Sequence, residues 1–341
     1  MKKKIILQST EYDLQKSILK LQENLPNWER DIFLFLTTWF SDSAVIEVQT
    51  SGSTGVPKLI SKQKLALQNS ALMTGEFFGF SNGKTALLCL PAKYIAGKMM
   101  LVRAIEWGLK LDYIEPKNNL QLPNKSFFFA AMTPPQVEAN FDTLTNLENL
   151  IIGGAPVSLA LERKLMELPT KSFATYGMTE TVSHIALRKI GENNYTVLPS
   201  IAISKDDRNC LIINAPKLLA EPISTNDIVE ITSSNTFIWK GRADHVINSG
   251  GLKISPEIIE GKIASFIQRS YFVAGITDKK WGEKVALIIE GDSFKTDKLV
   301  CDMQTILPKT HVPKNLFFVN KFQYTENGKL KRKETLNLVV T

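Results

Sequence analysis

A stretch of nine residues that is rich in hydroxyl groups and glycine contains the first side chains that could do chemistry. Its residues are Thr50, Ser51, Gly52, Ser53, Thr54, Gly55, Val56, Pro57 and Lys58. Glycine lets the backbone come close to an anion, the hydroxyl groups can donate hydrogen bonds, and the lysine adds a positive charge. The spacing of a Walker A loop is absent. The composition predicts a loop that holds phosphate, and a solvated turn is the alternative for such a cluster taken alone.

Two further loops carry groups that could line a ligand site. The first consists of Gly153, Gly154, Ala155 and Pro156, and the second of Tyr176, Gly177, Met178, Thr179, Glu180 and Thr181. Each follows a stretch that predicts a strand, at residues 150–152 and 172–175. Ligands of parallel sheets gather beyond the carboxyl ends of the strands, so we expect both loops at that edge. The alternatives are ordinary strand-to-helix turns, a helix-start acid for Glu180 and core packing for Tyr176.

The elements that would position these loops follow a regular alternation. A strand pattern at residues 44–48 precedes the first loop and a helical pattern at residues 63–77 follows it, so we expect a strand, the loop and then a helix. Strand and helix patterns continue to alternate, which predicts a layered α/β domain with a parallel sheet. Further strands are expected at residues 85–90, 110–114 and 126–131, and helices at residues 14–21, 28–40, 135–141 and 158–168.

The pattern changes after residue 194, where short alternating stretches predict a small β subdomain. Its strands are expected at residues 194–198, 210–214, 227–232 and 236–240. A new helix is expected at residues 256–268, because proline and glutamate stand in its first turn. We therefore predict a large N-terminal α/β domain of residues 1–243, a boundary at Asp244, and a small α+β C-terminal domain of residues 244–341.

The composition limits the class of protein. The chain has 341 residues, 44% of them hydrophobic, and a net charge of +7, which suits a globular protein that handles anionic nucleotides and gives only weak support to nucleic-acid binding. Cys89, Cys210 and Cys301 lie far apart without metal-ligand spacing, so we predict buried free thiols in a reducing compartment. No apolar run has membrane-spanning length and no signal-peptide core follows the first four residues, so the cytoplasm is the expected location.

Five motifs, in this order, resemble those of the adenylate-forming superfamily, which includes acyl-CoA synthetases, peptide-synthetase adenylation domains and luciferases. They are the loop of residues 50–58, Tyr176-Gly177-Met178-Thr179-Glu180, Thr225-Asn226-Asp227, Gly241-Arg242-Ala243-Asp244 and Asn327-Gly328-Lys329, over roughly residues 45–335. The resemblance implies two reaction steps. A carboxylate attacks the α-phosphate of ATP bound with Mg²⁺, giving an acyl-adenylate and pyrophosphate. In the CoA ligases a thiol then displaces AMP, so ATP, Mg²⁺ and CoA are the cofactors implied.

The resemblance also implies which residues contact the phosphates and the metal. The loop of residues 50–58 would hold the β- and γ-phosphates. Thr179 would reach the α-phosphate. Glu180 would supply a carboxylate to Mg²⁺, an ion that prefers one or two carboxylates together with phosphate oxygens. Donors fixed around the departing pyrophosphate would stabilise the charge that develops on it.

The adenosine contacts implied by the resemblance come from two regions. The adenine would lie beside Gly154, Ala155 and Pro156, with Tyr176 stacking on the base and Gly177 and Met178 following it. Asp227 would accept hydrogen bonds from the ribose hydroxyls, and Arg242 would assist. Asn226 departs from the superfamily pattern, which usually has glycine at this position.

Three further positions would serve the change between the two steps. Lys329 resembles the mobile adenylation lysine, although a lone lysine in a glycine turn is usually solvated. Asp244 matches the hinge about which the small C-terminal domain moves. Gly250 and Gly251 match the loop beside the pantetheine tunnel, where small residues would admit a narrow thiol arm.

The acid substrate is indicated by two segments, residues 93–103 and 176–188, which resemble compact o-succinylbenzoate–CoA ligases of menaquinone biosynthesis. Tyr94 stands where the family often carries an aromatic residue or histidine beside the carboxylate. Lys98 or Arg103 could meet a second substrate carboxylate, and both could instead be surface charges. His184 could pack in the core or line the pocket. A ligase for another acid, an adenylation enzyme that loads a carrier protein, and a non-enzymatic adenylate-binding module are the alternatives.

Lys329→Ala tests the catalytic assignment made from sequence. Removing one preorganised donor should slow adenylation from ATP roughly 10²- to 10³-fold, while thioester formation from synthetic acyl-adenylate and CoA stays nearly intact. The two half-reactions are measured separately, with Lys331→Ala as the control that should change little. Equal losses in both half-reactions would indicate a folding defect, and no loss in either would mean that Lys329 is a surface residue.

Overall fold

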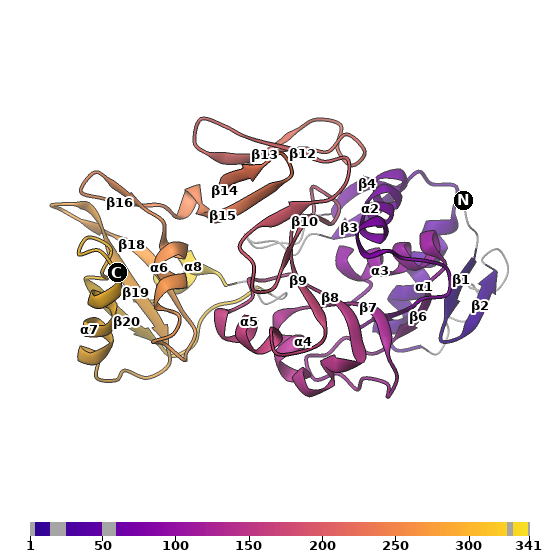
Figure 1. Ribbon diagram of the computed structural model, residues 1–341, viewed down its shortest axis with the longest axis horizontal. Helices are drawn as coiled ribbons and strands as arrows, with labels where there is room; N and C mark the ends of the chain where they lie inside the picture. Colours follow the sequence, from indigo (N-terminus) through magenta and orange to yellow (C-terminus); the bar gives the residue numbers. More distant parts are fainter. Residues whose placement is uncertain (1–3, 14–24, 50–58, 326–329, 340–341) are drawn as a thin grey trace. The chain divides into compact units, whose positions relative to one another are not determined.

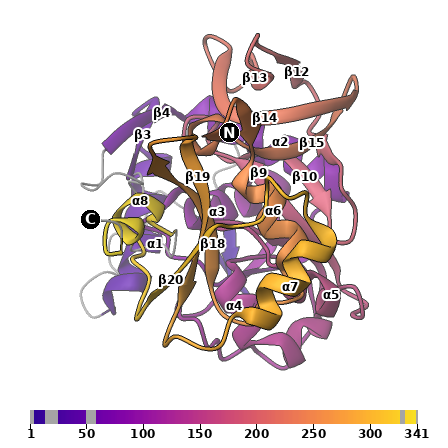
Figure 2. The same ribbon diagram turned by 90° about the vertical axis from the view of Figure 1, so that its left-hand side faces the viewer.

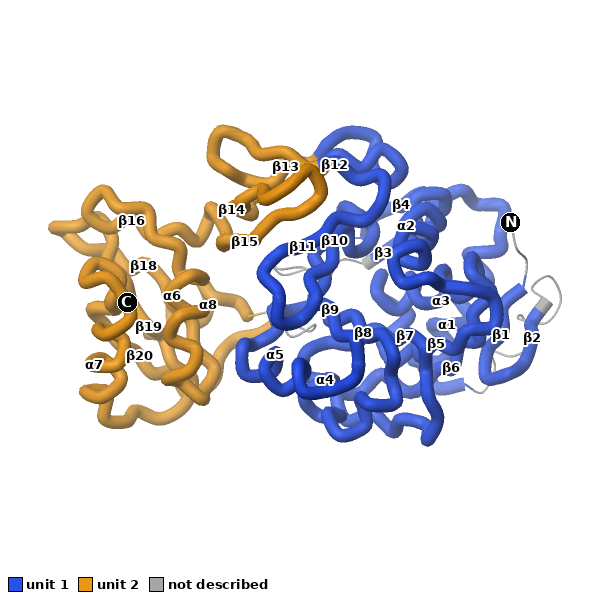
Figure 3. The backbone as a smooth tube through the Cα atoms, in the orientation of Figure 1, with its two compact units in different colours: residues 1–202, 214–222 blue, residues 203–213, 223–341 orange. Residues whose placement is uncertain are grey.

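The computed structural model describes residues 4–13, 25–49, 59–325 and 330–339 (Figure 1). The loop of residues 50–58, Lys329 and the helix expected at residues 14–21 therefore lie outside the described part of the chain. The chain divides into two compact units, one of residues 1–202 and 214–222 and the other of residues 203–213 and 223–341 (Figure 3). Asp244 lies within the second unit, and a hinge at this residue stays a prediction.

The first unit is built on a sheet whose central strands are parallel. They lie in the order β6 (Lys110–Tyr113), β5 (Thr85–Leu88), β7 (Phe127–Met132), β8 (Leu147–Ile152) and β9 (Lys171–Gly177). The flanking strands are β1 (Lys4–Leu7) and β2 (Thr10–Asp13) at one end, and β10 (His184–Lys189) and β11 (Tyr195–Val197) at the other. All six residues of β7 are buried, as expected for a parallel strand covered on both faces. The predicted layered α/β fold is confirmed.

Helices cover both faces of this sheet. They are α1 (Asn27–Phe40), α2 (Lys64–Phe78), α3 (Ile95–Trp107), α4 (Pro134–Ala139), the 3-10 helix η1 (Phe141–Asn146) and α5 (Leu159–Leu165). Leu161 and Leu165 of α5 pack with Ala130 of β7 in one core cluster. Phe129 points to the opposite face, because side chains alternate along a strand, and its ring lies 5.2 Å from that of Phe78 of α2.

The elements around residues 50–58 differ from the expected strand, loop and helix. Strand β3 (Val45–Gln49) pairs antiparallel with β4 (Leu59–Gln63), from Val45 opposite Gln63 to Gln49 opposite Leu59. These two strands form a separate sheet, and α2 begins only at Lys64. Residues 59–63 alternate between exposed and half-buried positions, a period of two that fits a strand and not the first turn of a helix.

The second unit contains a β subdomain and a smaller α+β region. Three of the four strands predicted for the subdomain lie here, whereas the strand expected at residues 194–198 is β11 of the first unit. The subdomain consists of β12 (Ala202–Lys205), β13 (Cys210–Asn214), β14 (Ile223–Ser233) and β15 (Thr236–Arg242). The α+β region consists of η2 (Ala243–His245), β16 (Ile247–Ser249), β17 (Leu252–Ile254), α6 (Pro256–Ile263), β18 (Tyr271–Asp278), β19 (Gly282–Glu290), α7 (Asp297–Ile306), β20 (Asn315–Val319) and α8 (Arg332–Leu336). Helices α6 and α7 pack on one face of the β18–β19–β20 sheet, and α8 packs on the other (Figure 2).

Two smaller expectations are corrected by the structure. Helix α6 ends at Ile263 and not at residue 268. The thiols of Cys89 and Cys210 are free and buried, but Cys301 is exposed because α7 buries only Leu299 and Met303. None of the described helices is both long enough and apolar enough to cross a membrane.

Gly97→Ala tests the close packing of α3 in the first unit. A Cβ at this position would lie 2.3 Å from the Pro91 carbonyl oxygen and 2.8 Å from the Ala92 nitrogen, so backbone would have to move. Overpacking of this kind costs about 1–3 kcal/mol, and we expect a lower thermal unfolding midpoint. Gly261→Ala in α6 is the matched control, since nothing lies within 4 Å of its added Cβ and a gain of about 0.4–1 kcal/mol is expected. An unchanged midpoint for Gly97→Ala would contradict this packing.

Candidate functional site

The turn that carries Glu180 connects β9 to the antiparallel strand β10, and no helix begins there. The buried Thr181 hydroxyl accepts a hydrogen bond from the Met178 amide at 3.1 Å and lies 2.9 Å from the Ser183 carbonyl oxygen. Gly177 is required at the start of the turn, because a Cβ there would lie 2.4 Å from that same carbonyl oxygen. Glu180 itself is exposed. The alternative that Glu180 is a helix-start acid is therefore wrong.

A lysine that the sequence analysis did not identify contacts this turn. The Lys62 ammonium group on β4 donates a hydrogen bond to the backbone carbonyl oxygen of Glu180 at 2.8 Å. Burial lowers the pKa of Lys62 below its ordinary value, and the negative charge of Glu180 opposes that shift. The alternation along residues 59–63 could have indicated a strand, but no local signal gives its partner 118 residues away.

The two loops expected at one edge of the sheet are brought together by parallel strands. Ile152 of β8 pairs with Ala174 of β9, so the segment Gly154, Ala155 and Pro156 follows the end of β8 beside the end of β9. Tyr176 makes an edge-to-face contact with Tyr195 at 5.8 Å. The Arg188 guanidinium group lies 5.5 Å from the Tyr195 ring and pairs with Glu162 at 2.5 Å. Tyr176 is thus held by an ordered set of neighbours.

Arg103 lies in a buried polar cluster and not on the surface. Its side chain is 1% exposed, and it donates a hydrogen bond to the Ser183 hydroxyl at 3.1 Å. Its Nε has no hydrogen-bond partner, and within the described residues no carboxylate forms an ion pair with it. Burial lowers the pKa of this guanidinium group to about 9, so it remains charged at neutral pH. The interpretation of Arg103 as a surface charge is wrong.

His184 belongs to the same cluster. Its Nδ1 lies 3.4 Å from the Ser183 hydroxyl and its Nε2 lies 3.3 Å from the Thr74 hydroxyl of α2. Burial, and then the positive charge of Arg103, lower the pKa of His184 well below its ordinary value of 6.5. The ring is therefore neutral at neutral pH, because two adjacent buried positive charges would repel each other.

Lys98 and Tyr94 occupy the other end of α3. The Lys98 ammonium group donates a hydrogen bond to the Glu47 carbonyl oxygen of β3 at 3.2 Å, and burial lowers its pKa. Tyr94 is half-buried at the residue preceding α3. Lys98 therefore contacts β3, while Arg103 contacts the residue preceding β10. The two residues considered as partners of a second substrate carboxylate thus lie in different parts of the first unit.

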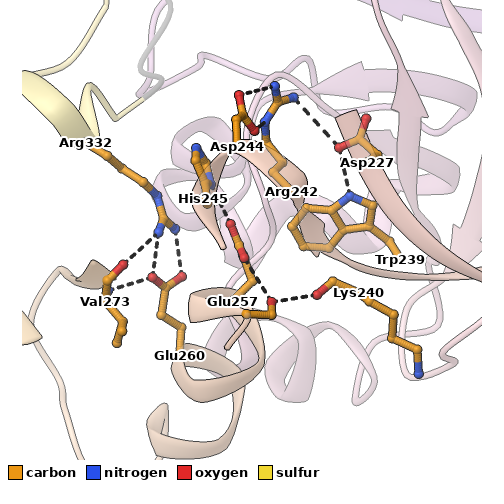
Figure 4. Close-up of polar contacts among 11 residues, drawn as sticks. Asp227, Trp239, Lys240, Arg242, Asp244, His245, Glu257, Glu260, Val273 and Arg332 are labelled. Atoms are coloured by element: carbon orange, nitrogen blue, oxygen red, sulfur yellow. Dashed lines mark hydrogen bonds and ion pairs between the residues drawn. The ribbon is translucent and has the colours of Figure 1, made fainter. Parts of the chain in front are cut away.

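The second unit places Asp227, Arg242 and Asp244 in one group (Figure 4). Asp227 of β14 lies opposite Arg242 of β15 in the sheet register, and their charged groups are 3.8 Å apart. The Trp239 indole donates a hydrogen bond to Asp227 at 3.0 Å, a contact that the sequence did not reveal. Arg242 donates two hydrogen bonds of 2.8 Å to Asp244, which lower the pKa of that carboxyl. Asn226 accepts a hydrogen bond from Arg208.

The remaining predicted positions in the second unit are a glycine turn and a lysine segment. Gly250 and Gly251 form the two-residue turn between β16 and β17 with φ of 58° and 83°, which suits glycine at both positions. Lys329 lies outside the described residues. Beyond it, Arg332 forms two hydrogen bonds of 2.7 Å with Glu260 (Figure 4).

A metal at Glu180 would have to bring most of its ligands with it. In the part of the chain that the structure describes, no group of three or more His, Cys, Asp or Glu side chains could hold a metal ion. One exposed carboxylate fits Mg²⁺ that is carried by nucleotide phosphates, since this ion keeps several water or phosphate oxygens.

Comparisons with known proteins agree on one family. The family model described as AMP-binding enzyme matches residues 41–218. A 2-succinylbenzoate–CoA ligase from Listeria monocytogenes is 25% identical over 87% of this chain and 70% of its own length, and one from Bacillus cereus is 24% identical over 87% and 71%.

Two solved structures are also similar to this chain. An AMP-forming acyl-CoA synthetase/AMP-acid ligase II-like protein from Dyadobacter fermentans is 34% identical, with a TM-score of 0.64 over 94% of this chain and 97% of that protein. The o-succinylbenzoate–CoA synthetase of Bacillus subtilis, in complex with ATP and magnesium, is 18% identical with a TM-score of 0.72 over 85% and 69%. The second likeness shows a shared fold.

His184→Gln tests the neutral buried histidine. Below about pH 6.5 the unfolded histidine binds a proton that the folded one does not. The free energy of unfolding is therefore highest above that pH and decreases as the pH falls below it. One such group contributes a slope of about 1.4 kcal/mol per pH unit. Urea denaturation between pH 7 and 5 should show this slope in the wild type and a smaller one in the variant. His311→Gln in the second unit is the control, and equal slopes for wild type and His184→Gln would contradict the assignment.

Proposed function

The chain belongs to the family of AMP-binding enzymes, and on that premise we propose that it is an o-succinylbenzoate–CoA ligase. The reaction class is that of an AMP-forming acyl-CoA ligase. In the proposed first step a carboxylate oxygen of the acid bonds to the α-phosphorus of ATP and pyrophosphate leaves. In the second step the CoA sulfur attacks the acyl carbon, AMP leaves, and o-succinylbenzoyl-CoA is formed.

The observation that carries the choice of acid is Arg103. Burying a charge without a partner is costly, and the other arginines in similar surroundings have carboxylate partners. Arg188 pairs with Glu162 and Arg332 pairs with Glu260. Arg103 is more deeply buried than either, at 1% exposure, and within the described residues it has no such partner. A bound anion would satisfy it.

o-Succinylbenzoate supplies that anion because it has two carboxylates. We propose that the aliphatic carboxylate reacts and that the ring carboxylate meets Arg103, with the Ser183 hydroxyl beside it. Because the ring of His184 is neutral, the guanidinium group of Arg103 is the positively charged member of this cluster. The Listeria and Bacillus relatives are 2-succinylbenzoate–CoA ligases by name, which supports the same acid.

The other predicted residues take the roles expected from their motifs. We propose that Tyr176 and the segment of residues 154–156 contact adenine, that Thr179 contacts the α-phosphate, and that Asp227 with Arg242 binds the ribose. Glu180 would hold Mg²⁺, which supplies positive charge to the phosphates when bound. Lys329, the residue 50–58 loop and the hinge at Asp244 complete the proposal, with Gly250 and Gly251 beside the CoA thiol arm.

We also propose the binding partners and the cellular location of the protein. The partners are a small carboxylic acid, ATP and CoA, and no feature of the sequence calls for nucleic acid. The three free thiols support the cytoplasm as the location. Acceleration of AMP release by free CoA would separate this function from the loading of a carrier protein.

Arg103→Met tests the acid. Pyrophosphate release is measured with o-succinylbenzoate and with 4-oxo-4-phenylbutanoate, which lacks only the ring carboxylate. A charged hydrogen bond predicts a preference for the dicarboxylic acid of roughly 10- to 100-fold in kcat/KM. The variant should lose this preference and keep its rate with the monocarboxylic acid, because a buried charge replaced by an apolar side chain of similar size usually leaves folding intact. A wild type that uses both acids equally, or a variant that still discriminates, would contradict the proposal.

A further inference from the structure

The hairpin of β3 and β4 makes a specific polar contact with the turn that carries Glu180. Both belong to the first unit, but β3 and β4 form a sheet of their own and share no backbone ladder with the central strands. Lys62 bridges the two by donating to the Glu180 carbonyl oxygen at 2.8 Å. The contact therefore joins two regions that the backbone ladders leave unconnected.

The atom that Lys62 contacts matters. A lysine beside a glutamate would ordinarily form an ion pair with the carboxylate, but Lys62 bonds the backbone carbonyl instead. Within the described residues, the Glu180 carboxylate accepts no hydrogen bond and forms no ion pair. The ammonium group thus fixes the residue at its main chain, and its hydrogen bond does not occupy the carboxylate oxygens.

Hydrogen bonds within the turn hold its other residues. The buried Thr181 hydroxyl ties Met178 to Ser183, and the Val182 amide donates a hydrogen bond to the Thr179 carbonyl oxygen at 3.0 Å. Val182 adopts a φ of 69°, a conformation that is unfavourable for a β-branched residue. The turn therefore holds a strained position that its hydrogen bonds must maintain, and Lys62 supplies the hydrogen bond at its exposed tip.

We propose that Lys62 is a positioning residue for Glu180, which it holds so that the carboxylate is presented to Mg²⁺ bound with the nucleotide. This rests on the proposed function, because it takes Glu180 as the metal carboxylate. The partial burial of Lys62 supports the inference, since a lysine that only improved solubility would keep its ammonium group in water.

Lys64, the first residue of α2, offers a control directly after the β3–β4 hairpin. Its ammonium group also donates to a backbone carbonyl oxygen, that of Ser41 at 2.7 Å, and burial also lowers its pKa. Its acceptor follows α1 and is not part of the Glu180 turn. Lys62→Met and Lys64→Met therefore each remove one lysine-to-carbonyl bond, and only the first should affect the turn.

Two measurements test the proposal. In ligand-free protein, hydrogen exchange at the amides of residues 178–183 should become faster in Lys62→Met and stay as in the wild type in Lys64→Met. In pyrophosphate release with ATP and o-succinylbenzoate, Lys62→Met should need roughly 10-fold more Mg²⁺ for half-maximal rate, the scale expected for a group that orients a metal ligand. Lys62→Arg should recover part of the loss.

The outcomes separate this inference from the proposed function. If the wild type releases no pyrophosphate with any acid tested, the proposed function fails, and unchanged hydrogen exchange in Lys62→Met would then overturn the positioning role as well. If the wild type is active but Lys62→Met keeps its exchange rates and its Mg²⁺ requirement, only this inference fails. Equal shifts in Lys62→Met and Lys64→Met would mean that the two lysines merely stabilise the first unit in general, which also overturns the positioning role.

Discussion

The hydrogen-bonded register of β8, β9 and β10 is the constraint on which the candidate site of the first unit depends. Parallel pairing of β8 with β9 places residues 154–156 beside Tyr176. Antiparallel pairing of β9 with β10 then returns the chain within a few residues and places His184 opposite Gly177. The turn between β9 and β10 thus carries Glu180 and also Ser183, which contacts Arg103. A slip of one residue in β9 would turn Tyr176 to the other face of the sheet.

Lysines that bond to the backbone are a second feature of this unit. Lys62, Lys64 and Lys98 each donate a hydrogen bond to a backbone carbonyl oxygen, and nearby carboxylates also stabilise their charges. Carbonyl groups satisfy an ammonium group without neutralising it. The positive charges of these lysines would favour the anionic nucleotides and acids that an AMP-binding enzyme must attract.

The sequence was sufficient for the features that have a local signal. Strand patterns followed by glycine-rich strings predicted the parallel sheet and the loop at residues 153–156, because strand ends in such a sheet share one edge. Tyr176 and Gly177, expected in the second loop, are instead the last two residues of β9. Features that depend on distant partners were missed. Strand β4 (Leu59–Gln63) was not predicted, because neither β3 nor β4 shows by itself that the two strands pair. The partners of Lys62 and Trp239 could not be seen for the same reason, and Arg103 stayed undecided until its burial was known.

The guanidinium group of Arg103, which has no carboxylate partner among the described residues, has a consequence for the lifetime of the protein in a cell. If the acid binds there as proposed, it removes an electrostatic cost that the empty protein carries, and it stabilises the folded state by mass action. The filled enzyme would then spend less time in the partly unfolded forms that proteases degrade. The amount of enzyme in the cell would rise and fall with the supply of its own acid, without any change in transcription.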